Sequence, residues 1–188
     1  MRHLPNLICL ARIALIWPIV VALEAAEYRA ALGLFFVAGV SDGLDGYLAK
    51  RFGWTSEFGK FIDPLADKLL LVTVFIVGTW LGLVPWWLTA AAVARDVMIG
   101  LGALVFRLWF GPLRGRPTVI SKINTVVQLG YLVGVIGRAA FGVLPPEMLD
   151  ALAVVTFVTT VLSGADYVFA FTRRAWSEPV GAPRTPGA

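Results

Sequence analysis

Four aspartates cluster in one short stretch of the chain, at Asp42, Asp45, Asp63 and Asp67. The first two are three positions apart and the last two are four apart, so each pair shares one face if the stretch is helical. Four carboxylates in a partly apolar setting repel one another, and Lys68 alone cannot neutralise them. Carboxylate oxygens suit Mg²⁺ or Mn²⁺, and four of them can hold two ions. The spacing therefore predicts a site for two divalent ions.

The elements that position these carboxylates are predicted to be helices in a membrane. The chain has 188 residues, is 59% hydrophobic and only 15% charged, and has a mean hydropathy of +0.81. A soluble domain carries about a quarter charged residues, and a helix needs roughly 20 residues to cross the hydrocarbon layer. The sequence thus predicts an all-α integral membrane protein with six transmembrane helices. They are expected near 7–23, 30–51, 61–83, 86–110, 121–142 and 148–172.

The lysines and arginines predict the orientation of these helices. Most of them lie in one set of loops and chain ends, which includes 51–60 and 111–120, whereas the opposite set holds only Arg29 and Arg138. The positive-inside rule then places both termini and the carboxylates on the cytoplasmic side. Residues 1–176 are predicted to form the membrane domain, and the Pro- and Gly-rich residues 177–188 a disordered tail. The net charge of +4 favours contact with anionic membrane lipids over nucleic acid.

The segment around the aspartates resembles a family signature. The pattern Asp-x2-Asp-Gly-x2-Ala-Arg-x8-Gly-x3-Asp-x3-Asp is typical of the CDP-alcohol phosphatidyltransferases. In one respect the chain departs from it, because Lys50 stands where arginine is usual and Arg51 follows. Lysine keeps the charge but lacks the planar fork of arginine, so either Lys50 or Arg51 takes the arginine's place. The other signature positions are matched with every spacing kept, by Asp42, Asp45, Gly46, Ala49, Gly59, Asp63 and Asp67.

This resemblance implies a six-helix membrane enzyme, usually a homodimer, whose site opens to the cytoplasm. The expected location is a bacterial inner membrane. Such enzymes use an acceptor hydroxyl to displace CMP from a CDP-linked donor such as CDP-diacylglycerol. The resemblance implies that the four aspartates bind the ions and that Asp67 is also the general base. Arg12, in an apolar run that looks like the family's first helix, is expected to face a polar cavity. The implied nucleotide-binding positions are Asn6, Gly46, Ala49, Lys50, Ser56 and Gly59.

A second segment bears on the acceptor. Residues 114–128 are polar and basic for a loop entering a helix. Positive-inside anchoring alone could explain the arginines of this segment. Together with an Arg-Asp pair at 95–96, the segment resembles the CMP-forming cardiolipin synthases. That resemblance implies phosphatidylglycerol as the acceptor, with glycerol 3-phosphate as the alternative. The candidate acceptor-binding residues are Arg95, Arg116, Lys122, Asn124 and Gln128.

Two other classes of function remain open at this stage. A divalent-cation transporter also carries intramembrane acids, but it predicts acids spread across the membrane depth, whereas these four lie near one face. A scaffold without catalysis would not need the signature. A Ser-His hydrolase is disfavoured because the only histidine is His3, at the terminus.

Overall fold

The computed structural model describes the backbone of residues 4–52, 59–109 and 118–177, and the side chains of residues 10–41, 66–103, 105, 118–169 and 172. Within these ranges every regular element is an α-helix, which confirms the predicted all-α class for the described residues. The helices are α1 (Leu4–Glu24), α2 (Tyr28–Phe52), α3 (Gly59–Trp80), α4 (Trp86–Trp109), α5 (Val119–Phe141) and α6 (Pro146–Ser177).

Each helix overlaps one predicted apolar stretch, but the ends differ. Helix α1 begins at Leu4 rather than near 7, and α6 continues to Ser177 rather than ending near 172. The difference has a physical reason, because hydropathy marks only the apolar part of a helix. Arginine is a good helix former, so Arg173 and Arg174 do not interrupt the hydrogen bonding of α6.

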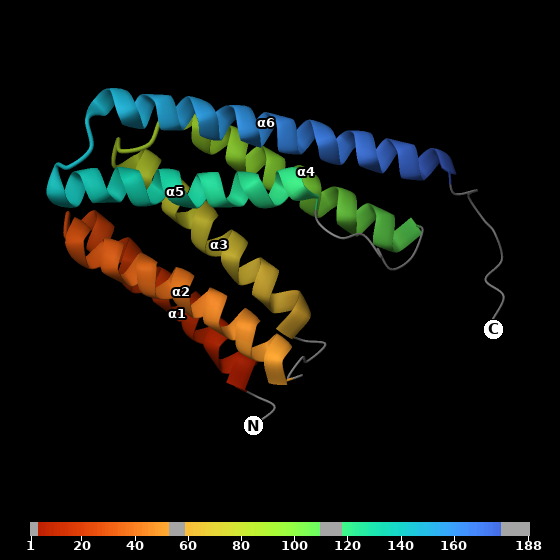
Figure 1. Cartoon of the computed structure of the whole chain (residues 1–188), viewed down its shortest axis with the longest axis horizontal. Coiled ribbons are helices and arrows are strands. Elements are labelled where there is room, and N and C mark those ends of the chain that lie inside the picture. Colours follow the sequence, from red (N-terminus) through yellow and green to blue (C-terminus); the bar gives the residue numbers. More distant parts are fainter. Residues whose placement is uncertain (1–3, 53–58, 110–117, 178–188) are drawn as a thin grey trace.

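Successive helices run in opposite directions (Figure 1). Helix α1 packs against α2 and α3, while α6 packs against α4 and α5. Contacts of α2 with α5 and of α3 with α4 join the two groups. The end of α2 and the start of α3 therefore lie at the same end of the bundle, separated by residues 53–58.

Short turns at the other end of the bundle fix the helix pairs. Gly82 and Gly142 have positive φ angles of 71° and 68°, which glycine adopts without steric cost. Gly142 caps α5 and donates its N–H to the carbonyl of Arg138 at 2.8 Å. The first residue of α6 is Pro146, a position that needs no backbone donor. These turns make α3–α4 and α5–α6 antiparallel pairs.

The interior of the bundle is apolar at its centre but contains many polar groups. Phe75 on α3 stacks against Tyr131 on α5, with ring centroids 6.2 Å apart. Several polar or charged side chains are as well buried as this core, and they come from α1, α4, α5 and α6. They include Arg12, Arg95, Asn124, Gln128, Thr156, Thr160 and Ser163.

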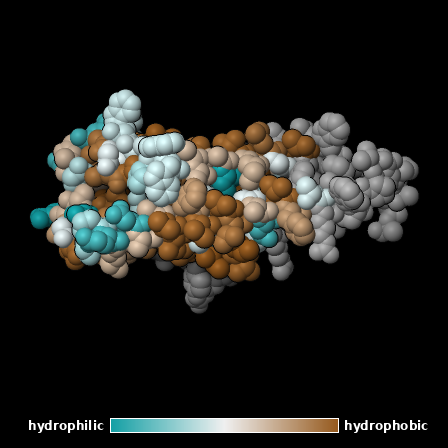
Figure 2. Space-filling view, turned by 90° about the horizontal axis from the view of Figure 1, so that it is seen from above, coloured by the Kyte–Doolittle hydropathy of each residue, from teal (hydrophilic) through white to brown (hydrophobic). Residues whose placement is uncertain are grey.

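Many large apolar side chains are exposed on the outer surface. Trp80 and Trp17 are 88% and 75% exposed, and Phe169 is 69% exposed. Figure 2 shows apolar side chains gathered along the middle of one face, with hydrophilic ones at one end. Among the described residues, Val119–Phe141 and Pro146–Phe169 are long and apolar enough to cross a membrane. The two helices are thus the described candidates for spans, and the six-span topology remains a prediction.

Candidate functional site

The four aspartates of the sequence motif lie on two helices. Asp42 and Asp45 fall in the second half of α2, and Asp63 and Asp67 in the first half of α3. The helical backbone puts each pair on one face, and the end of α2 and the start of α3 lie at the same end of the bundle (Figure 1). The side chain of Asp67 is described, whereas those of Asp42, Asp45 and Asp63 lie outside the described residues.

Most of the predicted donor-site residues fall in the same part of the chain. The side chains of Asn6 and Lys50 lie outside the described ones, although both residues are helical. Gly46, Ala49 and Gly59 are also helical positions in this region. Ser56 and the predicted acceptor residue Arg116 lie outside the described residues altogether. These assignments therefore stay predictions.

The described carboxylate of the motif is held by a buried arginine. Nη1 of Arg12 on α1 donates to Oδ1 of Asp67 on α3 at 2.6 Å. The Arg12 side chain is 1% exposed and that of Asp67 is 40% exposed. A charged hydrogen bond of this length fixes the direction of a carboxylate, and burial of a guanidinium requires such partners. Asp67 therefore presents an oriented, accessible carboxylate. The sequence indicated that Arg12 would face polar groups, but not which one.

A second charged cluster lies beside it. Nζ of Lys68 on α3 donates to Oδ1 of Asp96 on α4, and Nη1 of Arg95 donates to the same oxygen, at 2.6 Å. The side chains of Lys68, Asp96 and Arg95 are 37%, 11% and 3% exposed, respectively. The cluster thus runs from a buried arginine outward to an accessible lysine.

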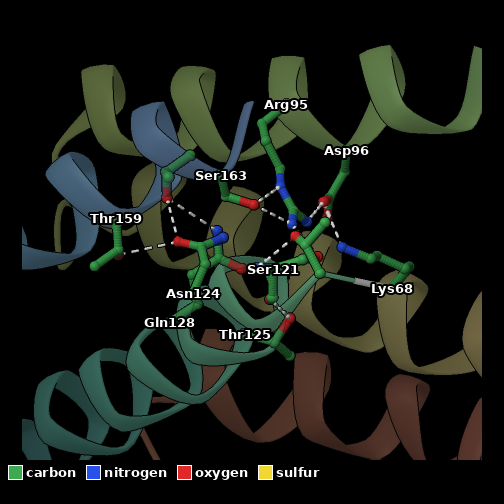
Figure 3. Close-up of polar contacts among 11 residues, drawn as sticks. Lys68, Arg95, Asp96, Ser121, Asn124, Thr125, Gln128, Thr159 and Ser163 are labelled. Carbon is green, nitrogen blue, oxygen red and sulfur yellow. Dashed lines mark hydrogen bonds and ion pairs between the residues drawn. The ribbon is translucent and has the colours of Figure 1, made fainter. Parts of the chain in front are cut away.

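Arg95 points into the bundle (Figure 3). Its Nη2 donates to Oγ of Ser121 on α5 at 2.6 Å, and its Nε and Nη2 donate to Oγ of Ser163 on α6 at 3.2 and 2.6 Å. With Asp96 included, one guanidinium links α4, α5 and α6. The acceptor role predicted for Arg95 remains a prediction.

Asn124 and Gln128 share one face of α5, as their spacing predicted, and both are fully buried. The hydroxyls of Thr159 and Thr160 on α6 donate to Oδ1 of Asn124 at 3.1 and 2.9 Å, and Nε2 of Gln128 donates to Thr160 at 3.3 Å (Figure 3). Nδ2 of Asn124 has no hydrogen-bond partner among the described residues.

Lys122 differs from these neighbours on α5. Its side chain is exposed, so the structure places it apart from the buried amides rather than with them. The acceptor roles predicted for Lys122, Asn124 and Gln128 remain predictions.

Comparison with known proteins addresses the identity of this site. A family model described as "CDP-alcohol phosphatidyltransferase" matches residues 2–171, which include all six helices except the end of α6. The chain belongs to this family. The match covers both halves of the bundle, so the Arg12–Asp67 pair and the Arg95 cluster are parts of one CDP-alcohol phosphatidyltransferase domain.

Relatives of the chain carry two kinds of name. The cardiolipin synthases (CMP-forming) of Rattus norvegicus and Homo sapiens are 32% and 31% identical over 180 residues, covering 87% of this chain and 60% of each relative. A CDP-diacylglycerol–glycerol-3-phosphate 3-phosphatidyltransferase of Yersinia pestis (strain Pestoides F) is 32% identical over 152 residues, covering 77% of this chain and 78% of that protein. The chain thus spans 60% of the length of the two cardiolipin synthases, and the names leave two acceptors open.

Sequence reasoning missed several members of the polar network. Asp96 was noted only as part of a resemblance, and Ser163, Thr159 and Thr160 were not singled out. A signal was available, because Thr156, Thr160 and Ser163 recur at four- and three-residue spacing on the otherwise apolar α6. Such a polar face in an apolar helix indicates hydrogen bonds to a neighbouring helix.

Proposed function

We propose that this member of the CDP-alcohol phosphatidyltransferase family transfers the phosphatidyl group of CDP-diacylglycerol to a hydroxyl of phosphatidylglycerol, giving cardiolipin and CMP. The observation that carries the proposal is the signature on α2 and α3, with its last aspartate both accessible and held by Arg12. The choice of phosphatidylglycerol is supported by the cardiolipin synthases among the relatives.

We propose further that the chain spans a membrane six times, in a bacterial inner membrane, with both termini and the site on the cytoplasmic side. The burial pattern supports this, since two arginines and two amide side chains are buried while many large apolar side chains are exposed. Trp80 and Trp86 are 88% and 73% exposed where α3 ends and α4 begins, a place typical of an interfacial aromatic belt. A homodimer, implied by the family resemblance, is part of the same proposal.

The residues of the motif fit divalent ions. Asp42, Asp45, Asp63 and Asp67 offer only hard oxygen ligands, on two helical faces, and the described carboxylate of Asp67 is accessible. These four residues would hold Mg²⁺ or Mn²⁺. Bound ions supply positive charge that neutralises the diphosphate and its leaving group.

The protein's own residues then perform the transfer. Asp67 accepts the proton of the acceptor hydroxyl, and Arg12 keeps the Asp67 carboxylate in one direction. The acceptor oxygen forms a bond to the phosphorus that carries the diacylglycerol, while the bond from that phosphorus to the CMP oxygen breaks. CMP leaves with the bonding electrons. Proton transfer to a positioned carboxylate contributes about 10²- to 10⁴-fold to such a rate.

Lys50 is proposed to contact the donor diphosphate. Replacing it with alanine should raise the KM for CDP-diacylglycerol by about tenfold or more, because a hydrogen bond to a charged group is lost. Lys50→Arg should be tolerated, because it restores the residue usual in the signature. Steady-state CMP release at varied donor concentrations measures both effects. An unchanged donor KM in Lys50→Ala would assign the role to Arg51.

The acceptor is tested by supplying labelled CDP-diacylglycerol with phosphatidylglycerol or with glycerol 3-phosphate and separating the lipid products. We expect cardiolipin from phosphatidylglycerol. The Yersinia pestis relative named for glycerol 3-phosphate supports the second candidate, a phosphatidylglycerophosphate synthase. Phosphatidylglycerophosphate without cardiolipin would favour that candidate. Metal-ion flux without CMP release from either mixture would indicate a transporter.

A further inference from the structure

Helix α3 directs two consecutive charged residues toward different neighbours. Asp67 contacts Arg12 on α1, whereas Lys68 contacts Asp96 on α4. The donor motif continues on α2, which packs against α1. The Lys68 side of α3 instead faces α4, the helix that carries Arg95 and Asp96. The two sides of α3 thus offer two separate places for substrate groups next to the same carboxylate.

Two cations of the second charged cluster share one carboxylate. Nζ of Lys68 and Nη1 of Arg95 both donate to Oδ1 of Asp96. A cation pair that shares one carboxylate can bind an added anion through its remaining donors. Arg12 and Arg95 are buried, at 1% and 3% exposed, whereas Lys68 is 37% exposed. Lys68 is therefore where an anion can approach.

The hydrogen bonds of the cluster lead to the same residue. A lysine ammonium has three donors, and the bond to Asp96 uses one of them. Arg95 is turned inward to Ser121, Ser163 and Asp96. Asp96, held by Arg95, fixes the Lys68 ammonium on the α4 side of α3.

We propose that Lys68 binds the phosphate of the acceptor, with Asp96 and Arg95 as its positioning residues. The inference rests on the proposed function and deepens it, because it assigns an acceptor contact on the described side of the site. The phosphate is the group that phosphatidylglycerol and glycerol 3-phosphate share. The diphosphate of the donor is the other phosphate group that Lys68 could bind, and separate KM values for donor and acceptor distinguish the two.

The test compares Lys68→Gln and Lys68→Arg with the native protein. Glutamine can still donate to Asp96 but removes the charge, and arginine keeps the charge. Lys68→Gln should raise the acceptor KM by about ten- to a hundredfold, with the donor KM within about twofold of native. Lys68→Arg should recover most of the acceptor affinity. Arg29→Ala, which removes one exposed positive charge at the opposite end of the bundle, is the matched control and should change neither KM.

Three outcomes would overturn the proposal. A folded Lys68→Gln protein with lower thermal stability but an unchanged acceptor KM would make Lys68 a link between helices only. A raised donor KM with an unchanged acceptor KM would assign Lys68 to the diphosphate. The third outcome is read from the melting temperature of the purified protein with glycerol 3-phosphate or with inorganic phosphate, in the absence of donor. An equal rise in melting temperature for native protein and Lys68→Gln, or no rise in either, would contradict the proposal whether or not turnover occurs. The proposed function fails separately, if the native protein releases no CMP with either acceptor.

Discussion

Replacing Asp42 with asparagine is expected to remove nearly all turnover, by about 10³-fold or more, while the protein stays folded. A neutral amide binds a divalent cation far more weakly than a carboxylate does, and charge on the diphosphate is then not neutralised. CMP release from CDP-diacylglycerol, measured over a range of Mg²⁺ or Mn²⁺ concentrations, gives the effect. EDTA should abolish the activity of the native protein, and added ion should restore it.

Asp150→Asn is the matched control for this substitution. Asp150 is exposed near the start of α6, at the end of the bundle away from the motif, so the same loss of one carboxylate should leave activity unchanged. Full activity of the native protein in EDTA, or of Asp42→Asn at ordinary ion concentrations, would contradict the assignment of the motif to metal ions.

Asp67→Asn should lose transfer by about 10²- to 10⁴-fold and still bind CDP-diacylglycerol. The amide cannot accept the hydroxyl proton, whereas the three remaining aspartates still provide ion ligands. Single-turnover CMP release and equilibrium binding of the donor separate the two effects. Donor binding that falls in proportion to activity would make Asp67 mainly a ligand and would exclude its role as base.

The contact with Arg12 adds a second readout to this substitution. Asp67→Asn removes a negative charge 2.6 Å from a guanidinium that is 1% exposed, so the free energy of unfolding should fall by about 1–3 kcal/mol. The double variant Arg12→Met/Asp67→Asn removes both charges and should regain stability without regaining activity. Its thermal unfolding in detergent, compared with both single variants, distinguishes lost chemistry from lost folding.

The helices were predictable because the cost of unpaired backbone groups in hydrocarbon leaves few alternatives to a helix. The signature fixed the relation of Asp63 to Asp67 through local spacing alone. The same local argument put Asn124 and Gln128 on one face of α5. These features depend on residues three or four positions apart, which the helical period determines.

The partners of the charged residues were not predictable in this way. Arg12 and Asp67 are 55 positions apart, and Arg95 and Ser163 are 68 apart. Which of them meet depends on the order and rotation of packed helices, which a single sequence does not specify. Arg95 and Asn124 were predicted to bind the acceptor, but the sequence did not indicate their hydrogen bonds to α6.

The hydroxyls of Thr160 and Ser163 lie on α6, which is synthesised after α4 and α5. Before α6 is inserted, Arg95 lacks its bonds to Ser163 and Asn124 lacks its bonds to Thr159 and Thr160. Buried polar groups without hydrogen bonds cost free energy, so α4 and α5 complete their hydrogen bonding only when α6 packs against them. The Arg12–Asp67 pair joins α1 to α3 and can form earlier. During synthesis the contact that holds the Asp67 carboxylate can therefore form before the contacts that complete the hydrogen bonding of the Arg95 guanidinium.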